Sequence, residues 1–279
     1  MNLVIQGGAC PTFLLDRLQT TTGASQIDLL SPQVIRLYKA SRNSAFDADL
    51  VPLLENERLD WAFVAPQTRL KDFGLICFDM DSTLITIECI DELADFAGKK
   101  AEVAAVTEAA MRGEIDYPES LRQRLRLLAG LDARVLAQVY AERLQLSPGA
   151  HDLLTAAQSA GLRTAILSGG FTYFTERLRI ELGFDFATSN ELEISGGKLT
   201  GRVLGEVVDA KAKARHLIRL RTELGLQPSQ VIAIGDGAND IPMMAEAGLS
   251  VAYRAKPATR EKADIALNFS GLDGFVNLF

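Results

Sequence analysis

The chain has 279 residues, 48% hydrophobic and 23% charged, a composition typical of a soluble globular protein with one large domain or two modest ones. Its formal net charge of −7 argues against nonspecific binding to nucleic acid, which needs a basic surface. No segment approaches the roughly 20 apolar residues of a membrane span, and the first residues do not resemble a signal peptide. Three cysteines without CxxC spacing indicate a reducing compartment, so we expect a cytoplasmic protein.

Residues 1–74 have the pattern of a small α/β domain. Strand-like apolar runs occur at residues 3–5, 34–38 and 61–64, and apolar residues with helical spacing lie between them. No catalytic side chains gather in this region. We interpret it as a folding or association module, through which two copies of the chain could form a homodimer. A ligand sensor is the alternative that the sequence leaves open.

The apolar run at residues 75–78 predicts a buried strand, and two acids, Asp79 and Asp81, follow it directly. Two anions at this spacing repel each other unless a cation or a shared proton relieves them. The pair therefore suggests a hard divalent metal, with one Asp free to attack phosphorus. An acidic strand-to-helix turn is the alternative that the pair alone does not exclude.

Residues 88–146 have apolar residues at helical spacing and no clear strands, which predicts a helical insertion that can close over a site as a cap. From residue 147 onward strand and helix patterns alternate, which indicates βαβ units and a mostly parallel sheet. We therefore predict an α/β fold with three parts. The N-terminal domain is residues 1–74, the core is residues 75–87 and 147–279, and the cap is residues 88–146.

Two further predicted strands end in polar residues. Residues 164–167 lead into Ser168-Gly169-Gly170, and residues 231–234 lead into Gly-Asp-Gly-Ala-Asn-Asp at 235–240. Ligand sites of parallel α/β sheets lie at the carboxyl ends of the strands, so we expect these groups to meet Asp79 and Asp81. Acids hold Mg²⁺, and a hydroxyl with backbone N–H groups can cradle an anion. The sequence thus predicts a joint metal and phosphate site.

One lysine breaks a local rule of helix electrostatics. Asp209 is predicted to cap a helix, which puts Lys211 and Lys213 in its first turns, where the macrodipole disfavours cations. Lys213 shares a helical face with Leu217 and Leu220, whereas Lys211 lies on a solvated face. Because functional residues often break such rules, we expect Lys213 to point inward and to have a function.

Four motifs in this order resemble the haloacid dehalogenase superfamily of phosphatases, most closely its phosphoserine phosphatase branch. They are Asp-Met-Asp-Ser-Thr at 79–83, Ser-Gly-Gly-Phe at 168–171, Lys213, and Gly-Asp-Gly-Ala-Asn-Asp at 235–240. The resemblance implies a Rossmann-like core of this superfamily with a helical cap inserted after the first motif. The N-terminal domain vaguely resembles the ACT-like modules fused to some relatives.

The resemblance also implies a reaction. Asp79 would be the nucleophile and Asp81 the general acid and base in Mg²⁺-dependent hydrolysis of O-phospho-L-serine, the last step of serine biosynthesis. Mg²⁺ would be held by the carboxylates of Asp79 and Asp236 and the main-chain carbonyl of Asp81, with Asp240 supporting them from behind.

The same resemblance implies a set of substrate contacts. Glu88 would bind the substrate ammonium group, Arg124 the substrate carboxylate, and Met111 and Tyr117 would shield the site from water. The phosphate would be held by Ser168, Gly169, Gly170, Lys213 and Asn239. Two alternatives are another small phosphorylated substrate and phosphoryl transfer to a different alcohol. A third, a phosphate-binding protein without turnover, is disfavoured because a pure binder needs no nucleophile beside an acid–base group.

Overall fold

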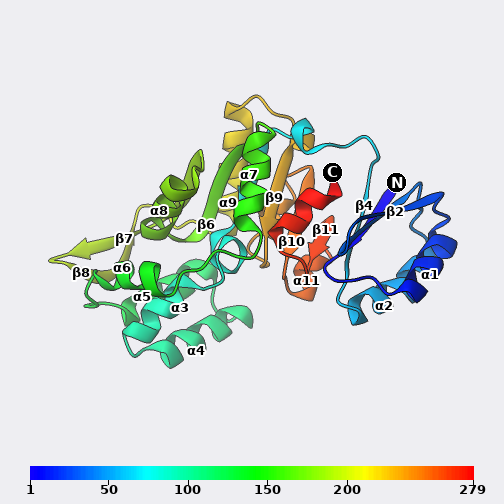
Figure 1. Cartoon of the computed structure of the whole chain (residues 1–279). Helices are drawn as coiled ribbons and strands as arrows, with labels where there is room; N and C mark the ends of the chain where they lie inside the picture. The colour runs from blue at the N-terminus through cyan, green and yellow to red at the C-terminus, as the bar shows by residue number, and fades with distance from the viewer.

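The computed structural model describes residues 1–279 and contains two separate sheets, with a group of helices beside the larger sheet (Figure 1). We call residues 1–64 the N-terminal unit, the seven-stranded sheet with its flanking helices the core, and residues 88–146 the cap. None of the helices combines the length and apolar composition that a bilayer-spanning helix requires. The predicted fold class, α/β with a mostly parallel sheet and a small N-terminal sheet domain, is confirmed.

The N-terminal unit follows the order βαββαβ and forms an antiparallel sheet with strand order β2-β3-β1-β4. Its elements are β1 (Asn2–Gln6), α1 (Thr12–Thr22), β2 (Gln26–Ser31), β3 (Val34–Tyr38), a π-helical turn (Phe46–Leu50), α2 (Val51–Asn56) and β4 (Asp60–Val64). One face of the sheet packs against the helices, and Val4, Val34, Ala62 and Val64 on the other face join the hydrophobic cluster of the core. The three strands predicted in this region are present, and β2 is an additional strand.

The core sheet has the strand order β11-β10-β9-β5-β6-β7-β8. All neighbouring strands are parallel except β7 and β8, which form an antiparallel hairpin. The strands are β5 (Leu75–Phe78), β6 (Arg163–Phe171), β7 (Phe186–Ser195), β8 (Lys198–Leu204), β9 (Val231–Gly235), β10 (Leu249–Tyr253) and β11 (Ile265–Leu267). Helices cover both faces, so successive side chains of β5 enter different hydrophobic clusters, Ile76 on one side and Cys77 on the other.

The helices of the core connect its strands and carry the C-terminus. They are α7 (Ala150–Ser159), α8 (Thr172–Leu182), α9 (Ala210–Glu223), α10 (Ile241–Met244), α11 (Pro257–Arg260) and short 3₁₀ turns at Leu70–Asp72, Pro228–Gln230 and Leu272–Leu278. Asp209 is the N-cap residue of helix α9, and its side chain accepts a hydrogen bond from the N–H of Ala212 at 2.7 Å.

The cap consists of α3 (Cys89–Phe96), α4 (Lys100–Met111), α5 (Tyr117–Leu127) and α6 (Val135–Glu142). The two segments that join the cap to the core lie side by side. The N–H of Thr86, before the cap, donates to the carbonyl of Gln145, after it, at 2.9 Å. The β7–β8 hairpin also reaches the cap, where the N–H of Gly130 donates to the carbonyl of Leu199 at 2.8 Å. The cap is therefore held by a paired hinge and by one hairpin of the core.

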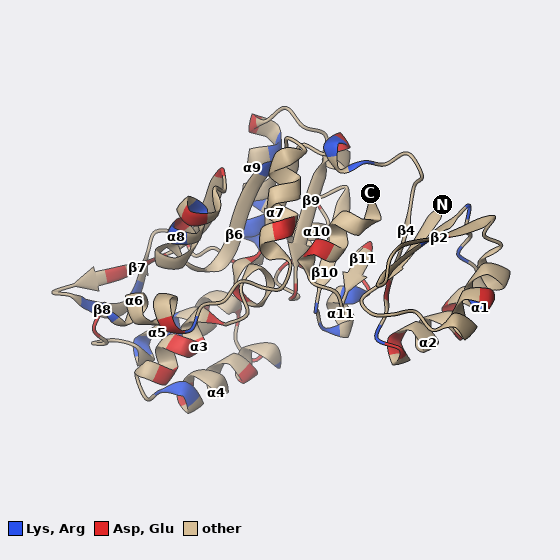
Figure 2. Ribbon diagram, in the orientation of Figure 1, with Lys and Arg blue, Asp and Glu red and all other residues tan.

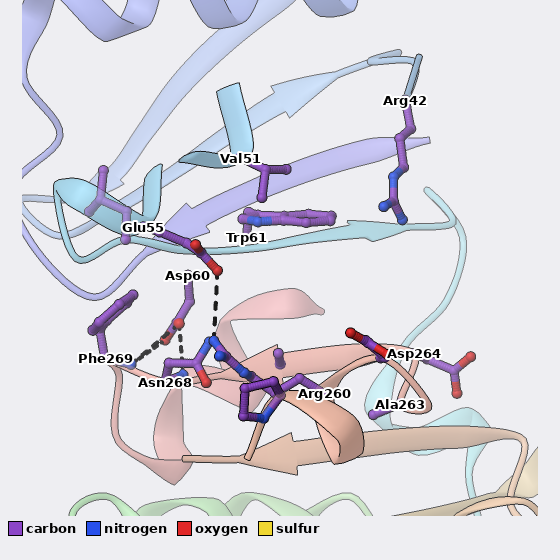
Figure 3. A pocket seen from close by; sticks show the side chains of 14 residues that line it. Arg42, Val51, Glu55, Asp60, Trp61, Arg260, Ala263, Asp264, Asn268 and Phe269 are labelled. Carbon is purple, nitrogen blue, oxygen red and sulfur yellow. Dashed lines mark hydrogen bonds and ion pairs between the residues drawn. The ribbon is translucent and has the colours of Figure 1, made fainter. Parts of the chain in front are cut away.

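The N-terminal unit is attached to the core by a buried carboxylate. Asp60, at the start of β4, accepts hydrogen bonds from the N–H groups of Asn268, Phe269 and Ser270 at 2.7, 3.1 and 2.8 Å. Figure 3 shows Asp60 beside Asn268 and Phe269. The Gln6 side chain adds a bond to the carbonyl of Gly274 at 2.8 Å. Because these bonds are buried and one partner is charged, they fix the orientation of the N-terminal unit.

Candidate active site

Three strand ends bring polar side chains together at one edge of the core sheet. Strand β5 lies between β6 and β9, so the residues that follow these strands are neighbours. Asp79, Asp236 and Asp240 each present one carboxylate oxygen within 4.8 Å of the others. Carboxylates this close repel one another, and a divalent cation is the group that would relieve them.

Asp79 is held in one orientation by three donors. Its Oδ1 accepts the N–H of Met80 at 2.7 Å, and its Oδ2 accepts Lys213 Nζ at 2.7 Å and Asn239 Nδ2 at 3.3 Å. Its side chain is only 5% exposed, so these bonds replace most of its hydration. The carboxylate is thus both oriented and partly neutralised, as a nucleophile that approaches an anionic phosphate must be.

Lys213 lies between two carboxylates in the protein interior. Its Nζ is 2.7 Å from Asp79 and 2.8 Å from Asp240, and its side chain is 1% exposed. Burial alone would lower the pKa of Lys213, but the carboxylates of Asp240 and Asp79 raise it above its ordinary value. Lys213 therefore remains a cation, and it faces inward while Lys211 is exposed, as the leucine stripe of the helix predicts.

Asp81 sits two residues beyond Asp79 on an extended stretch of chain, followed by Ser82 with a φ of 56°. Its Oδ1 accepts the N–H of Cys89 at 3.2 Å. Enclosure by the protein raises the pKa of Asp81 to about 7 with help from the charge of Asp79, although the hydrogen bond from Cys89 lowers it. A carboxyl group with such a pKa can donate and accept a proton near neutral pH.

The remaining acids differ in how far their oxygens are already used. Asp236 accepts one bond, from Thr83 Oγ1 at 3.1 Å, and burial together with Asp79 raises its pKa to about 6. Asp240 uses both oxygens, one for Lys213 and one for the N–H of Gly237 at 3.1 Å. Asp236 is thus available to a metal, whereas Asp240 is suited to holding Lys213. An all-oxygen donor set of this kind fits Mg²⁺.

Ser168, Gly169 and Gly170 lie beside these acids. The N–H of Gly170 donates to the buried Ser168 Oγ at 2.9 Å, and the carbonyl of Gly169 accepts the Tyr117 hydroxyl at 3.0 Å. A Cβ atom on Gly170 would lie 2.7 Å from Asp81 Oδ2, so only glycine leaves room here.

The predicted turn at these glycines was wrong in one respect. We expected the strand to end at residue 167, with the glycines in a turn at the start of a helix, but β6 continues to Phe171. The register of β6 against β7 shifts between Leu167 and Phe171, which pairs with Asn190. The pairing of β6 with β7 is therefore irregular at the glycines, and the strand continues beyond them.

Arg124 differs from its neighbours in α5. Arg122 and Arg126 each lie within 4.0 Å of Glu119, at 3.5 and 3.6 Å, whereas Arg124 has no acidic partner within that distance. Its guanidinium lies 6.0 Å from the ring of Tyr117, whose hydroxyl reaches the core at Gly169. Arg124 is thus half-buried beside the cap–core contact, with its charge uncompensated.

The other two predicted cap contacts have different surroundings. Glu88 Oε1 accepts Ser82 Oγ at 2.7 Å, and although the residue is exposed, the surrounding protein atoms and the charge of Asp81 raise its pKa to about 8. Met111 ends α4 on the surface, 65% exposed, with its Sδ 3.8 Å from Lys256 Nζ. Glu88 therefore lies near the acids of the candidate active site, whereas Met111 lies on the surface of the cap.

Two buried polar residues belong to the site although the sequence analysis gave them no role. Thr83 donates to Asp236, as described above. Asn190 of β7 donates to the carbonyl of Gly169 at 2.8 Å and accepts the N–H of Val208 at 2.8 Å. The sequence alone does not show that these residues are buried; once Asn190 is seen to be buried, its amide is expected to have specific partners.

Comparison with known proteins agrees with this geometry. Residues 76–245 match the model of the haloacid dehalogenase-like hydrolase family. A phosphoserine phosphatase of Polaromonas sp. is 56% identical over 218 residues, which are 76% of this chain and 92% of that protein.

Solved structures resemble the whole chain. A HAD family hydrolase of Salmonella enterica serovar Typhi has a TM-score of 0.89 at 32% identity, covering 99% of this chain and 97% of that one. A probable phosphoserine phosphatase of Vibrio cholerae has a TM-score of 0.84 at 39% identity, covering 99% and 85%. The likeness therefore includes the N-terminal unit.

Proposed function

Because this chain belongs to the haloacid dehalogenase-like hydrolase family, we propose that it hydrolyses O-phospho-L-serine to L-serine and phosphate, the last step of serine biosynthesis. The observation that carries this proposal is the geometry of Asp79. Its carboxylate is held at 2.7 Å by a buried lysine, next to a second carboxyl group with a pKa of about 7. This pairing supplies a nucleophile and a proton donor two residues apart.

In the first half of the reaction Asp79 attacks phosphorus and the bond from phosphorus to the serine oxygen breaks. Lys213 stays charged and offsets the repulsion between the Asp79 carboxylate and the phosphate. We propose that Ser168, Gly169, Gly170 and Asn239 bind the phosphate oxygens, and the N–H of Gly170 would then exchange its bond to Ser168 Oγ for one to the phosphate. The product of this step is an aspartyl-phosphate on Asp79 and free serine.

Asp81 transfers a proton in each half of the reaction. Its raised pKa allows it to give a proton to the departing serine oxygen. It then takes a proton from the water molecule that attacks the aspartyl-phosphate, which returns Asp79 and releases phosphate. The hydrogen bond from the N–H of Cys89 keeps the carboxyl group in place between the two transfers.

We propose that Asp79 and Asp236, through their carboxylates, and Asp81, through its main-chain carbonyl, hold Mg²⁺. When bound, the ion supplies positive charge to the phosphate and to the crowded acids. Asp240 supports the arrangement through Lys213 and the N–H of Gly237.

Specificity for phosphoserine is proposed to come from the cap. Arg124 carries a charge without an acidic partner, which suits the substrate carboxylate. Glu88, beside Asp81, would accept the substrate ammonium group, and Tyr117 would shield the phosphate from water through its contact with Gly169. Met111 would complete the shield only if the cap moves inward, because it is exposed in this structure.

The test is phosphate release from a panel of phosphorylated metabolites, with Mg²⁺ and with a chelator. We expect phosphoserine to be turned over far faster than sugar phosphates or an aryl phosphate, and only with the metal. Equal rates on phosphoserine and sugar phosphates would remove the substrate assignment while leaving the phosphatase chemistry intact.

We also infer a homodimer formed through the N-terminal unit. Strand β2 lies at the edge of its sheet, and its Leu29 and Leu30 are 69% and 50% exposed. An antiparallel edge strand can pair with its own copy. Leu30→Lys should convert a dimer to a monomer in light scattering.

The free thiols of Cys10, Cys77 and Cys89 support the inferred cytoplasmic location.

A further inference from the structure

An open surface cavity of about 420 Å³ lies where the N-terminal unit meets the core, and none of the acids of the candidate active site lines it. We call it the arginine cavity; it is lined by Arg58, Arg254, Ala255, Arg260, Asn268 and Phe269. Arg58 comes from the turn before β4, and the other residues come from the core. Three cationic side chains and no acid line this space, and its volume lies within the range of small-molecule sites.

The three guanidinium groups are free to bind an acceptor, because Arg58 and Arg254 are exposed to solvent and Arg260 is only partly buried. No side-chain hydrogen bond joins any of them to an acceptor, and only Arg260 has an acid within 4.0 Å, Glu55 at 3.7 Å. The Nε atom of Arg260 is buried without a hydrogen-bond partner. Buried donors without a partner are rare because leaving them unpaired costs free energy. These donors are thus available to an acceptor that enters the cavity.

The backbone also holds two of these arginines in an unusual conformation. Only four residues other than glycine have a positive φ, and Arg58 (φ 57°) and Arg254 (φ 46°) are two of them. A third, Ser82, belongs to the candidate active site. The conformation of Arg58 ends helix α2, where the N–H of Leu59 donates to the carbonyl of Leu54 at 2.8 Å. Arg254 follows a strand, so no helix end accounts for its conformation, and such costly conformations cluster at functional sites. Aromatic rings brace both side chains, since Arg58 stacks over Phe269 at 5.2 Å and Arg254 over Tyr253 at 5.2 Å.

We propose that the arginine cavity binds a small molecule with a multiply charged oxyanion group, of the phosphate-ester or dicarboxylate class. Planar guanidinium groups bind such oxygens two at a time. A second cavity of about 350 Å³ shares Arg260, Asn268 and Phe269 with it, but acids also line that space (Glu55, Asp60, Glu261 and Asp264), so the anionic group would bind in the arginine cavity. Figure 3 shows this second cavity, with Arg260 facing Glu55 across the boundary between the two units.

This position makes the ligand a bridge between parts of the protein. Arg58 belongs to the N-terminal unit and Arg254 and Arg260 to the core, where Figure 2 marks basic residues on α11. Arg254 directly follows β10 and lies two residues before Lys256, whose Nζ contacts Met111 of the cap at 3.8 Å. A ligand held by Arg254 thus acts on the segment that touches the cap.

Isothermal titration calorimetry of the full-length, metal-free protein tests the proposal, with inorganic phosphate and succinate as separate probes. The variants are Arg58→Gln and Arg254→Gln, with Arg17→Gln as the control, because Arg17 is an exposed arginine of the same unit outside both cavities. Any phosphate bound at the catalytic acids is common to all four proteins, so the difference between isotherms reports the arginine cavity alone.

We expect wild type and Arg17→Gln to bind one anion that Arg58→Gln and Arg254→Gln bind about 10- to 100-fold more weakly, the effect of losing charge-assisted hydrogen bonds. A difference seen only with phosphate assigns the phosphate-ester class, and one seen only with succinate assigns the dicarboxylate class. Identical isotherms for all four proteins with both probes overturn the proposal. Phosphoserine turnover plays no part in this readout.

Discussion

At the scale of single residues, Asp79 carries the proposed chemistry, and its surroundings explain how it can be replaced without unfolding. The Asp79→Asn variant keeps the volume of the side chain, and its one remaining oxygen can still accept a bond from Met80 or from Lys213. It cannot attack phosphorus, so we expect phosphoserine turnover to fall by at least ~10³-fold. Stopped assays of phosphate release measure the loss, and the melting temperature reports folding. Near-wild-type activity would contradict the assigned nucleophile.

A second prediction concerns Gly170, because a larger residue there would clash with its neighbours. A Cβ atom there would lie 2.7 Å from Asp81 Oδ2 and 3.1 Å from Ser168 Oγ. Gly170→Ala should therefore displace the acid–base group and lower kcat on the order of 10²-fold, as small misplacements of catalytic groups do. Gly8→Ala is the matched control, since its Cβ would meet Leu59 at an ordinary 3.6 Å. If both variants keep full activity, the site can accommodate a Cβ atom at residue 170 without displacing Asp81.

The cap residues predict a change of specificity. Glu88→Gln and Arg124→Ala each leave one charged group of phosphoserine unpaired, which costs on the order of 2–5 kcal/mol in a closed site. We expect kcat/KM for phosphoserine to fall accordingly and that for an aryl phosphate to change little. Arg122→Ala serves as control because that arginine already pairs with Glu119 at the surface. Equal losses on both substrates would assign Glu88 and Arg124 to folding or chemistry.

Residues that break a local rule were the ones that the sequence could locate. Lys213 was found because a cation near a helix N-terminus needs a reason, and the structure shows two carboxylates as that reason. Asn190 breaks no such rule, so its sequence context does not mark it. Its role is to join Gly169 to Val208, and these contacts are between residues far apart in the sequence. The exposure of Met111 depends on how far the cap is closed, which no side-chain pattern encodes.

At the scale of secondary-structure elements, the apolar strands of the core were predictable because burial on both faces gives continuous apolar runs. Strand β2 was missed because most of its residues are at least partly exposed, so alternation is weak. The extension of β6 through Ser168 and the glycines depends on pairing with β7, a tertiary contact. The pairing of the β7–β8 hairpin with the cap depends likewise on segments far apart in sequence.

The docking of β4 onto the chain after β11 gives a prediction at this scale. Asp60→Ala removes the acceptor of three backbone N–H groups, and we expect a loss of about 3 kcal/mol in the free energy of unfolding. Trp61, the single tryptophan of the chain, lies next to it and reports the N-terminal unit. In urea, its fluorescence transition should precede the circular dichroism transition in Asp60→Ala and coincide with it in wild type and in the exposed control Asp16→Ala. Coincident transitions in all three proteins would show that Asp60 does not determine docking.

At the scale of the whole molecule, three acids from two separate parts of the chain lie so close together that their charges favour binding of a cation. Asp79, Asp236 and Asp240 lie together at the carboxyl edge of the core sheet, and Lys213 offsets only part of their charge. The raised pKa of Asp236 means that the folded protein disfavours its ionised form. A carboxyl group whose pKa is higher folded than unfolded lowers stability as pH rises between the two values, so at neutral pH the ionised Asp236 destabilises the metal-free fold.

This argument predicts opposite responses to charge removal with and without metal. In a chelator, Asp236→Asn should unfold at the same temperature as wild type or higher, because one repelling charge is gone. With Mg²⁺ at about 100 times its dissociation constant, wild type should gain about 2.7 kcal/mol, and Asp236→Asn should gain little. Scanning calorimetry measures both responses without any activity assay. An equal Mg²⁺ stabilisation of wild type and variant would move the metal away from Asp236. A variant that is much less stable in chelator would instead show that Asp236 holds the fold through Thr83.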